Sequence, residues 1–328
     1  MRDPRSILLD WAAQGRVQDL PQAMELLGLF PSPAAWRRFV DRLLLWLGTL
    51  LLALGVIFFF AYNWADLHRF AKFALVQAPL AVTLVAIGRL GLDGPAGRAA
   101  LLGASLLVGA LLALIGQTYQ TGADTFELFA AWAALILPWV LLGRFAPLWL
   151  LWISLANLAV GFWFQAFPGP LGWLSASQNL IWSLFALNSL AWILWEFFSL
   201  RGLAWLEGRW GPRLLATASG VQITVLATFW GVGADRIFLG SGSLASGLIL
   251  TVWLAWLALV GFVYRRLIWD LFVLAGGVLS LVVVIASFFI KNLAFGNAGG
   301  FLMVGLIIIG ISAAGGWWLK QVAAEHEA

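Results

Sequence analysis

Two short polar stretches interrupt an otherwise apolar chain, and they hold the side chains best suited to binding. The first stretch spans residues 61–73 and the second spans residues 116–127. Together they combine amide, carboxylate, hydroxyl and guanidinium groups, which form hydrogen bonds in several directions. If the two stretches are neighbours, they form one polar patch suited to a protein segment or a lipid headgroup. The candidate patch comprises Asn63, Asp66, Arg69, Gln117, Tyr119, Gln120 and Asp124.

Structural roles compete with binding at this patch. Asp124 and Glu127 have the spacing of a capping box, in which two side chains satisfy free N–H groups at the start of a helix. We expect this role for both, with binding as the alternative. Gln117, Tyr119 and Gln120 place three hydrogen-bonding side chains in four residues, more than a turn requires. They are candidates for contacting a partner, with support of the turn as the alternative.

Residues for most kinds of catalysis are missing. The only histidines, His68 and His326, cannot form a His-Glu-x-x-His zinc motif or a bis-histidine haem site. No cysteine and no glycine-rich phosphate loop is present, which excludes thiol nucleophiles and nucleotide hydrolysis by this chain. We predict no catalytic residue, no metal site and no cofactor. Catalysis by a carboxylate with arginines at the outer face stays open as an alternative.

The elements that position these groups are membrane-spanning helices. Of the 328 residues, 62% are hydrophobic and 10% are charged, whereas soluble proteins carry about 25% charged residues. A run of about 20 apolar residues crosses the hydrocarbon core, where only a helix satisfies the backbone of such a run. We predict an all-α polytopic bundle with ten spans, at residues 42–62, 70–90, 99–117, 126–143, 147–166, 178–198, 213–230, 244–263, 267–290 and 298–319.

The chain divides into three predicted parts. Residues 1–41 form a short amphipathic helical segment, residues 42–166 a bundle of five spans, and residues 167–328 a second bundle of five. An interfacial anchor is the simpler role for the first part, and a docking element for a cytosolic protein is the alternative.

Four neutral polar residues fall inside predicted spans. Asn157, Asn188 and Gln222 lie near mid-membrane, and Gln77 lies in the outer half of the second span. Hydrogen bonds between helices explain such residues, with a polar cavity as the alternative.

Two carboxylates fall at the cytoplasmic ends of predicted spans. We expect Glu196 and Asp270 to pair with nearby arginines, for which Arg201, Arg265 and Arg266 are the candidates. No carboxylate lies unambiguously at mid-bilayer, which argues against a proton-coupled or sodium-coupled pump.

Three strings within the first part of the chain resemble a known family. They are FFAYNW at 59–64, RFAK at 69–72 and IGQTYQTGAD at 115–124. Over residues 5–165 the sequence resembles the bacterial membrane family called domain of unknown function 2157. The resemblance implies an integral inner-membrane protein, often encoded beside a periplasmic-facing protein, and it implies no activity.

These features favour a non-catalytic scaffold or partner-binding component of a bacterial cell-envelope assembly. A transporter or lipid flippase is the alternative, and a membrane enzyme acting on lipid-linked substrates comes third. The expected partners are the lipid bilayer and a periplasmic-facing membrane protein. We expect no nucleic acid and no nucleotide, because the net charge of +4 is spread singly over short loops, where anionic lipid explains it.

The distribution of basic residues predicts the orientation. With the N-terminus in the cytoplasm, 15 of the 19 lysines and arginines fall on the cytoplasmic side, which leaves only Arg69, Lys72, Arg236 and Lys291 outside. Cytoplasmic loops of membrane proteins are enriched in these residues. We therefore predict that both termini lie in the cytoplasm.

Reporter fusions test this topology. Fusions at Gly94 and Gly208 should report the cytoplasm, and fusions at Gly122 and Gly169 should report the outer compartment, because the basic asymmetry holds only for this alternation. A cytoplasmic signal at Gly122 would overturn the arrangement.

Overall fold

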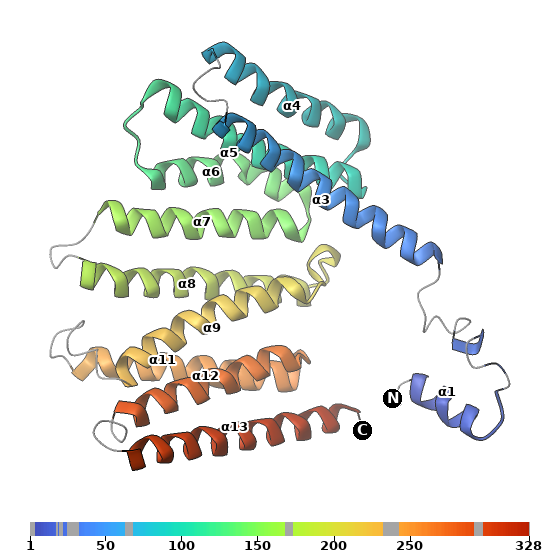
Figure 1. Cartoon of the computed structure of the whole chain (residues 1–328), viewed down its shortest axis with the longest axis vertical. Helices are drawn as coiled ribbons and strands as arrows, with labels where there is room; N and C mark the ends of the chain where they lie inside the picture. The colour runs from blue at the N-terminus through green and yellow to red at the C-terminus, as the bar shows by residue number, and fades with distance from the viewer. Residues whose placement is uncertain are drawn as a thin grey trace. The chain divides into compact units, whose positions relative to one another are not determined.

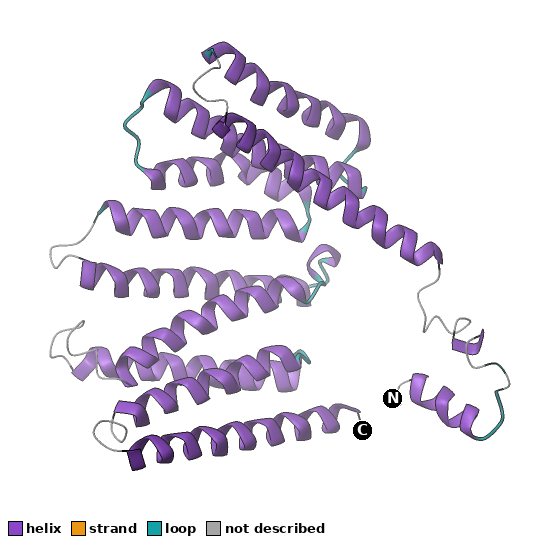
Figure 2. Ribbon diagram, in the orientation of Figure 1, coloured by secondary structure: helices purple, strands orange, loops and turns teal. Residues whose placement is uncertain are grey.

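The described part of the protein is almost entirely helical. The computed structural model describes residues 4–17, 19, 22–24, 33–62, 68–167, 173–231, 243–291 and 298–327. Within these ranges helices are joined by turns and loops, and no strand is present (Figure 2). The predicted all-α fold is confirmed.

The chain forms two compact units, one of residues 1–122 with 324–328 and one of residues 123–323. The predicted boundary between residues 166 and 167 falls inside the second unit, and that division stays a prediction. The first unit holds α1 (Pro4–Ala13), α3 (Pro33–Tyr62), α4 (Arg69–Leu90) and α5 (Pro95–Tyr119). Helix α5 packs against both α3 and α4, and it is the most buried of the three.

Small residues allow the tight turn between α4 and α5. Gly91 ends α4 at φ 68°, a left-handed conformation that favours glycine. A Cβ atom at Gly97 would lie 1.7 Å from the Gly91 carbonyl oxygen. Only glycine fits at position 97. The tight turn makes the two helices antiparallel, so their far ends, at Arg69 and Tyr119, lie on the same side.

The second unit is a series of helices that lie beside one another. It comprises α6 (Thr125–Gly143), α7 (Ala146–Ala166), α8 (Trp173–Leu200), a short 3-10 helix η1 (Ala204–Leu206), α9 (Trp210–Gly231), α11 (Ser243–Phe262), a π-helical turn η2 (Val263–Leu267), α12 (Leu271–Phe289) and α13 (Ala298–Glu327). Neighbours from α6 to α9 pack in chain order, and α9 also packs against α11 and α12 (Figure 1).

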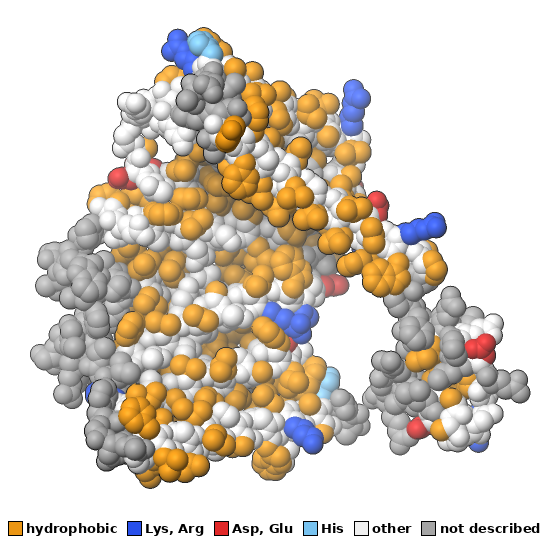
Figure 3. Space-filling view, viewed as in Figure 1, with side chains coloured by type: hydrophobic (Ala, Val, Ile, Leu, Met, Phe, Trp, Pro, Cys, Tyr) orange, Lys and Arg blue, Asp and Glu red, His pale blue; other side chains and the backbone are white. Residues whose placement is uncertain are grey.

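Tryptophan supplies much of the core of this unit. Trp192, Trp195, Trp253 and Trp256 are all buried, together with Tyr264. Outside the core, large apolar side chains are exposed along the helices, and hydrophobic atoms cover much of the visible surface (Figure 3). Such a surface suits a bilayer, because apolar side chains are favourable in contact with lipid and unfavourable in contact with water.

Nine helices in the described part of the chain are long and apolar enough to span a membrane. Ten spans are predicted, and the difference is α9, which covers the predicted span at residues 213–230. Ser219, Gln222 and Thr224 lower the apolarity of α9, yet these side chains are buried or half-buried. Helix α9 packs against other helices on several sides, and this packing allows it to carry polar side chains.

Replacing Gly220 in α9 tests this packing. A Cβ atom at Gly220 would lie 2.8 Å from the Trp256 ring, so we expect Gly220→Leu to destabilise the protein by about 1–3 kcal/mol through overpacking. Thermal unfolding in detergent measures the loss. Gly261→Leu in α11 is the control, because no atom lies within 4 Å of the Cβ position there. Equal stability of the two variants would contradict the close packing of α9 and α11.

Candidate functional site

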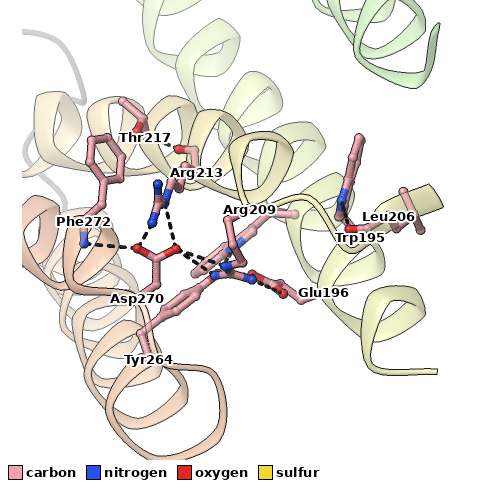
Figure 4. A network of polar contacts seen from close by, with 10 residues as sticks. Trp195, Glu196, Leu206, Arg209, Arg213, Thr217, Tyr264, Asp270 and Phe272 are labelled. Atoms are coloured by element: carbon pink, nitrogen blue, oxygen red, sulfur yellow. Dashed lines mark hydrogen bonds and ion pairs between the residues drawn. The ribbon is translucent and has the colours of Figure 1, made fainter. Parts of the chain in front are cut away.

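Charged side chains from α8, the start of α9 and the start of α12 meet at one end of the second unit (Figure 4). Glu196 lies in the C-terminal part of α8, Arg209 directly before α9, and Arg213 in the first turn of α9. Asp270 precedes α12 as its N-cap, and one of its carboxylate oxygens accepts a hydrogen bond from the N–H of Phe272 at 3.1 Å. An aspartate at this position satisfies a free N–H group of the helix start.

Two guanidinium groups neutralise the two carboxylates. Nη1 of Arg209 donates to both carboxylate oxygens of Glu196, at 3.0 and 3.1 Å. Nε and Nη2 of Arg209 donate to Oδ2 of Asp270, at 3.1 and 3.0 Å. Nε of Arg213 donates to the same oxygen at 2.9 Å. The Asp270 side chain has no exposed surface, and that of Glu196 is 10% exposed.

Tyr264 extends this network to η2, which directly follows α11. Its hydroxyl donates to Oε1 of Glu196 and accepts a hydrogen bond from Nε1 of Trp192 at 2.7 Å. The rings of Trp192 and Tyr264 stack with centroids 5.8 Å apart, and the Arg209 guanidinium lies 5.5 Å from the Tyr264 ring centre. The network therefore connects α8, α9, η2 and α12.

The electrostatics favour the charged forms of Asp270 and Arg209. Burial alone would raise the pKa of Asp270, but hydrogen bonds from Arg213 and Arg209, with their positive charges, hold its pKa below the ordinary value. Burial opposes the charge of Arg209 as well, yet the pKa of Arg209 is raised, mainly by the negative charge of Glu196. A carboxylate held in this way is a structural partner of arginine and a poor proton carrier.

Glu196 and Asp270 pair with arginines other than those predicted from the sequence. The ion pairs of Glu196 and Asp270 are formed with Arg209 and Arg213, whereas Arg201, Arg265 and Arg266 were expected. The start of α9 lies between α8 and α12, so its arginines reach both carboxylates. Arg201 instead lies over the ring of Phe197, at 4.6 Å.

The amides predicted near mid-membrane form a second cluster. Nδ2 of Asn188 donates to Oδ1 of Asn157 at 2.7 Å, and Nδ2 of Asn157 donates to Oδ1 of Asn188 at 3.1 Å. Nδ2 of Asn188 also lies 3.4 Å from Oε1 of Gln222. These contacts connect α7, α8 and α9. The fourth amide, Gln77, is exposed on α4 of the first unit. A binding role for any of the four amides stays a prediction.

The predicted outer patch is described in part. Asn63 and Asp66 lie outside the described residues. Arg69 is the first residue of α4 and Tyr119 the last of α5, so both lie at the same end of this helical hairpin, where the rings of Phe73 and Tyr119 are 6.0 Å apart.

The patch residues of α5 are accessible. Gln117, Tyr119 and Gln120 are exposed, and none has a side-chain hydrogen bond within the described chain. Gln120 ends the helix in a left-handed conformation at φ 45°. Binding by these residues stays a prediction.

Asp124 belongs to the second unit, where it precedes α6 as the N-cap. The capping box is present, and the Asp124 N–H donates to Oε2 of Glu127 at 3.1 Å. This is the helix-capping geometry expected from the spacing of the two residues.

In the described part of the chain, no group of three or more His, Cys, Asp or Glu side chains lies close enough together to hold a metal ion. The charged network is unsuited to a cation as well, since arginines occupy its carboxylates.

The long apolar helices and the paired polar groups between them define a polytopic α-helical membrane protein. Residues 9–149 match the model of the family described as Predicted membrane protein (DUF2157). The match confirms the family predicted from the sequence for this part of the chain. No curated protein and no solved structure matches the chain.

Removing Arg209 tests how far the second unit depends on the network. Arg209→Gln leaves Glu196 without its cation and Asp270 with only Arg213, so we expect a loss of about 3–5 kcal/mol in thermal unfolding. Arg201→Gln, which changes an exposed arginine at the same end of α8, should have little effect. The double variant Arg209→Gln/Glu196→Gln should recover part of the stability, because it removes the unpaired buried charge. Equal stability of Arg209→Gln and Arg201→Gln would contradict a structural role.

Proposed function

We propose that this protein is a non-catalytic membrane component, a scaffold or partner-binding subunit of a cell-envelope assembly in the bacterial inner membrane. The observation that carries the proposal is the pairing of its buried charges. In the described part of the chain, the buried carboxylates are Glu196 and Asp270, and arginines pair with both. Catalysis and proton transfer need an ionisable group whose charge state can change. Both carboxylates are engaged in ion pairs, and the arginines hold the pKa of Asp270 below its ordinary value.

The arrangement of amides weighs against the alternative of a transporter or flippase. A transport pathway needs polar groups that face the substrate, but Asn157 and Asn188 turn their amides toward each other. An enzyme acting on lipid-linked substrates needs a carboxylate and an arginine that converge in an open cleft. Asp270 and Arg209 do converge, but the carboxylate is fully buried.

A binding role for the end of α5 is supported by exposure. Tyr119 is 64% exposed, and the exposed amides of Gln117 and Gln120 have no hydrogen-bond partner among the described residues. Aromatic side chains with a polar group are favoured in protein interfaces because they bury apolar area while forming hydrogen bonds. In the predicted topology these residues lie at the outer face, where a periplasmic-facing membrane protein is the proposed partner.

Alanine substitution of this surface tests the proposal. The triple variant Gln117→Ala/Tyr119→Ala/Gln120→Ala should reach the wild-type level in the membrane and unfold at the wild-type temperature, because its side chains are exposed. Affinity purification from native membranes with quantitative mass spectrometry should show a protein that is retained by wild type and lost with the triple variant.

Gln321→Ala is the control, an exposed amide in α13 on the predicted cytoplasmic side. The proposed partner should be retained by this variant. If the triple variant fails to accumulate, its side chains support the hairpin and the binding role is wrong. If no protein differs between the triple variant and the control, the proposed surface is also wrong.

A further inference from the structure

A cavity of about 600 Å³ lies within the second unit, where α6 ends, α7 begins and α8 ends beside η1. This volume falls within the range of small-molecule and cofactor sites, about 300–1,000 Å³. Four tryptophans contribute to its walls, and most of its lining is apolar. Its lining includes Arg144, Trp149, Trp152, Ala191, Trp195 and Trp205.

Hydrogen bonds and stacking hold these walls in place. Nε1 of Trp152 donates to the carbonyl oxygen of Ala133 at 3.0 Å, and Nε1 of Trp195 donates to that of Leu206 at 3.3 Å. The rings of Trp149 and Trp205 stack with centroids 5.9 Å apart. The cavity is therefore formed by positioned side chains of the protein itself.

Two polar groups of the lining lack partners in the part of the chain that the structure describes. Arg144 ends α6, is exposed, and has no ion pair or hydrogen bond there. The indole N–H of Trp149 is buried and has no acceptor. A cation and a hydrogen-bond donor at an apolar cavity complement a molecule that has an anionic group and an apolar chain.

The position of the cavity fits such a molecule. It is lined by the C-terminal end of α6, the N-terminal end of α7 and the C-terminal end of α8, which the basic asymmetry assigns to the cytoplasmic side. At this level of a bilayer the phosphate groups of lipids meet the ends of helices. Basic pockets between membrane helices on the cytoplasmic side are suited to anionic lipid headgroups.

We propose that this cavity binds an anionic phospholipid, with its phosphate at Arg144 and one acyl chain between the tryptophans. The apolar walls provide most of the contact, and Arg144 selects for negative charge. A free phosphate ion would leave those walls unused. A neutral apolar molecule would leave the guanidinium without a partner. The proposal does not depend on the function proposed above.

Native mass spectrometry of the full chain in neutral detergent tests this site. Phosphatidylglycerol and phosphatidylcholine with identical acyl chains are titrated separately, and the fraction of protein that retains one lipid is measured. Wild type should retain phosphatidylglycerol at lower concentration than phosphatidylcholine. Arg144→Gln should weaken phosphatidylglycerol binding about fivefold, as expected for one arginine near a membrane surface. It should weaken phosphatidylcholine binding less, because the choline group offsets the charge of that lipid's phosphate.

Two further variants separate the contributions of charge and cavity. Ala191→Phe fills the cavity and should reduce retention of both lipids, with thermal unfolding as the check that the variant is folded. Arg201→Gln removes an exposed arginine that is not part of the lining and should retain lipid as wild type does. Inorganic phosphate at millimolar concentration should not displace phosphatidylglycerol.

Several outcomes would overturn the proposal. Equal retention of the two lipids by wild type would remove charge selection, and equal behaviour of Arg144→Gln and Arg201→Gln would remove Arg144 from the site. Displacement of lipid by inorganic phosphate would indicate a simple anion site. Unchanged retention by folded Ala191→Phe would place the lipid elsewhere.

Discussion

Water is absent from the core of a bilayer, so a polar side chain within a membrane bundle depends on a partner from the protein. In the second unit α9 supplies many of these partners. Arg209, directly before α9, and Arg213 in its first turn neutralise Glu196 and Asp270. Further along, Gln222 lies beside Asn188, and the hydroxyls of Thr224 and Ser280 are 2.6 Å apart. Helix α9 is less apolar than the candidate membrane spans, and its polar side chains are the partners of polar groups on the neighbouring helices.

The polar groups of the two units are used differently. In the second unit they face inward and connect α7, α8, α9, η2 and α12. In the first unit the buried face of α5 consists largely of apolar and small residues, and its amides and phenol are exposed at the C-terminal end of the helix. Internal pairing stabilises one arrangement of helices, whereas exposed groups at a helix end remain available to another molecule. Binding to a partner is therefore better supported for the first unit than for the charged network.

The helices were predictable from the sequence because the length of an apolar run and the thickness of a bilayer determine where a span lies. The capping box at Asp124 was predictable for a similar reason, since it depends on residues only three apart. The partners of Glu196 and Asp270 were not, because they depend on which helix lies between α8 and α12. Sequence proximity favoured Arg201 and Arg265, whereas helix packing selected Arg209 and Arg213. The cavity beside Arg144 was missed because its walls come from four separate elements.

The charged network also limits how the second unit can move. Alternating access would require helices to separate, and separating α8 or α12 from α9 would break ion pairs of Arg209 or Arg213. The Asp270 side chain has no exposed surface, so losing its arginines would leave a buried charge that costs several kcal/mol. A substrate would have to supply that free energy at each cycle. Asn157 and Asn188 likewise connect α7 to α8. Because the charged network and the amide cluster both hold these helices together, the second unit is better suited to the proposed scaffold role than to alternating access.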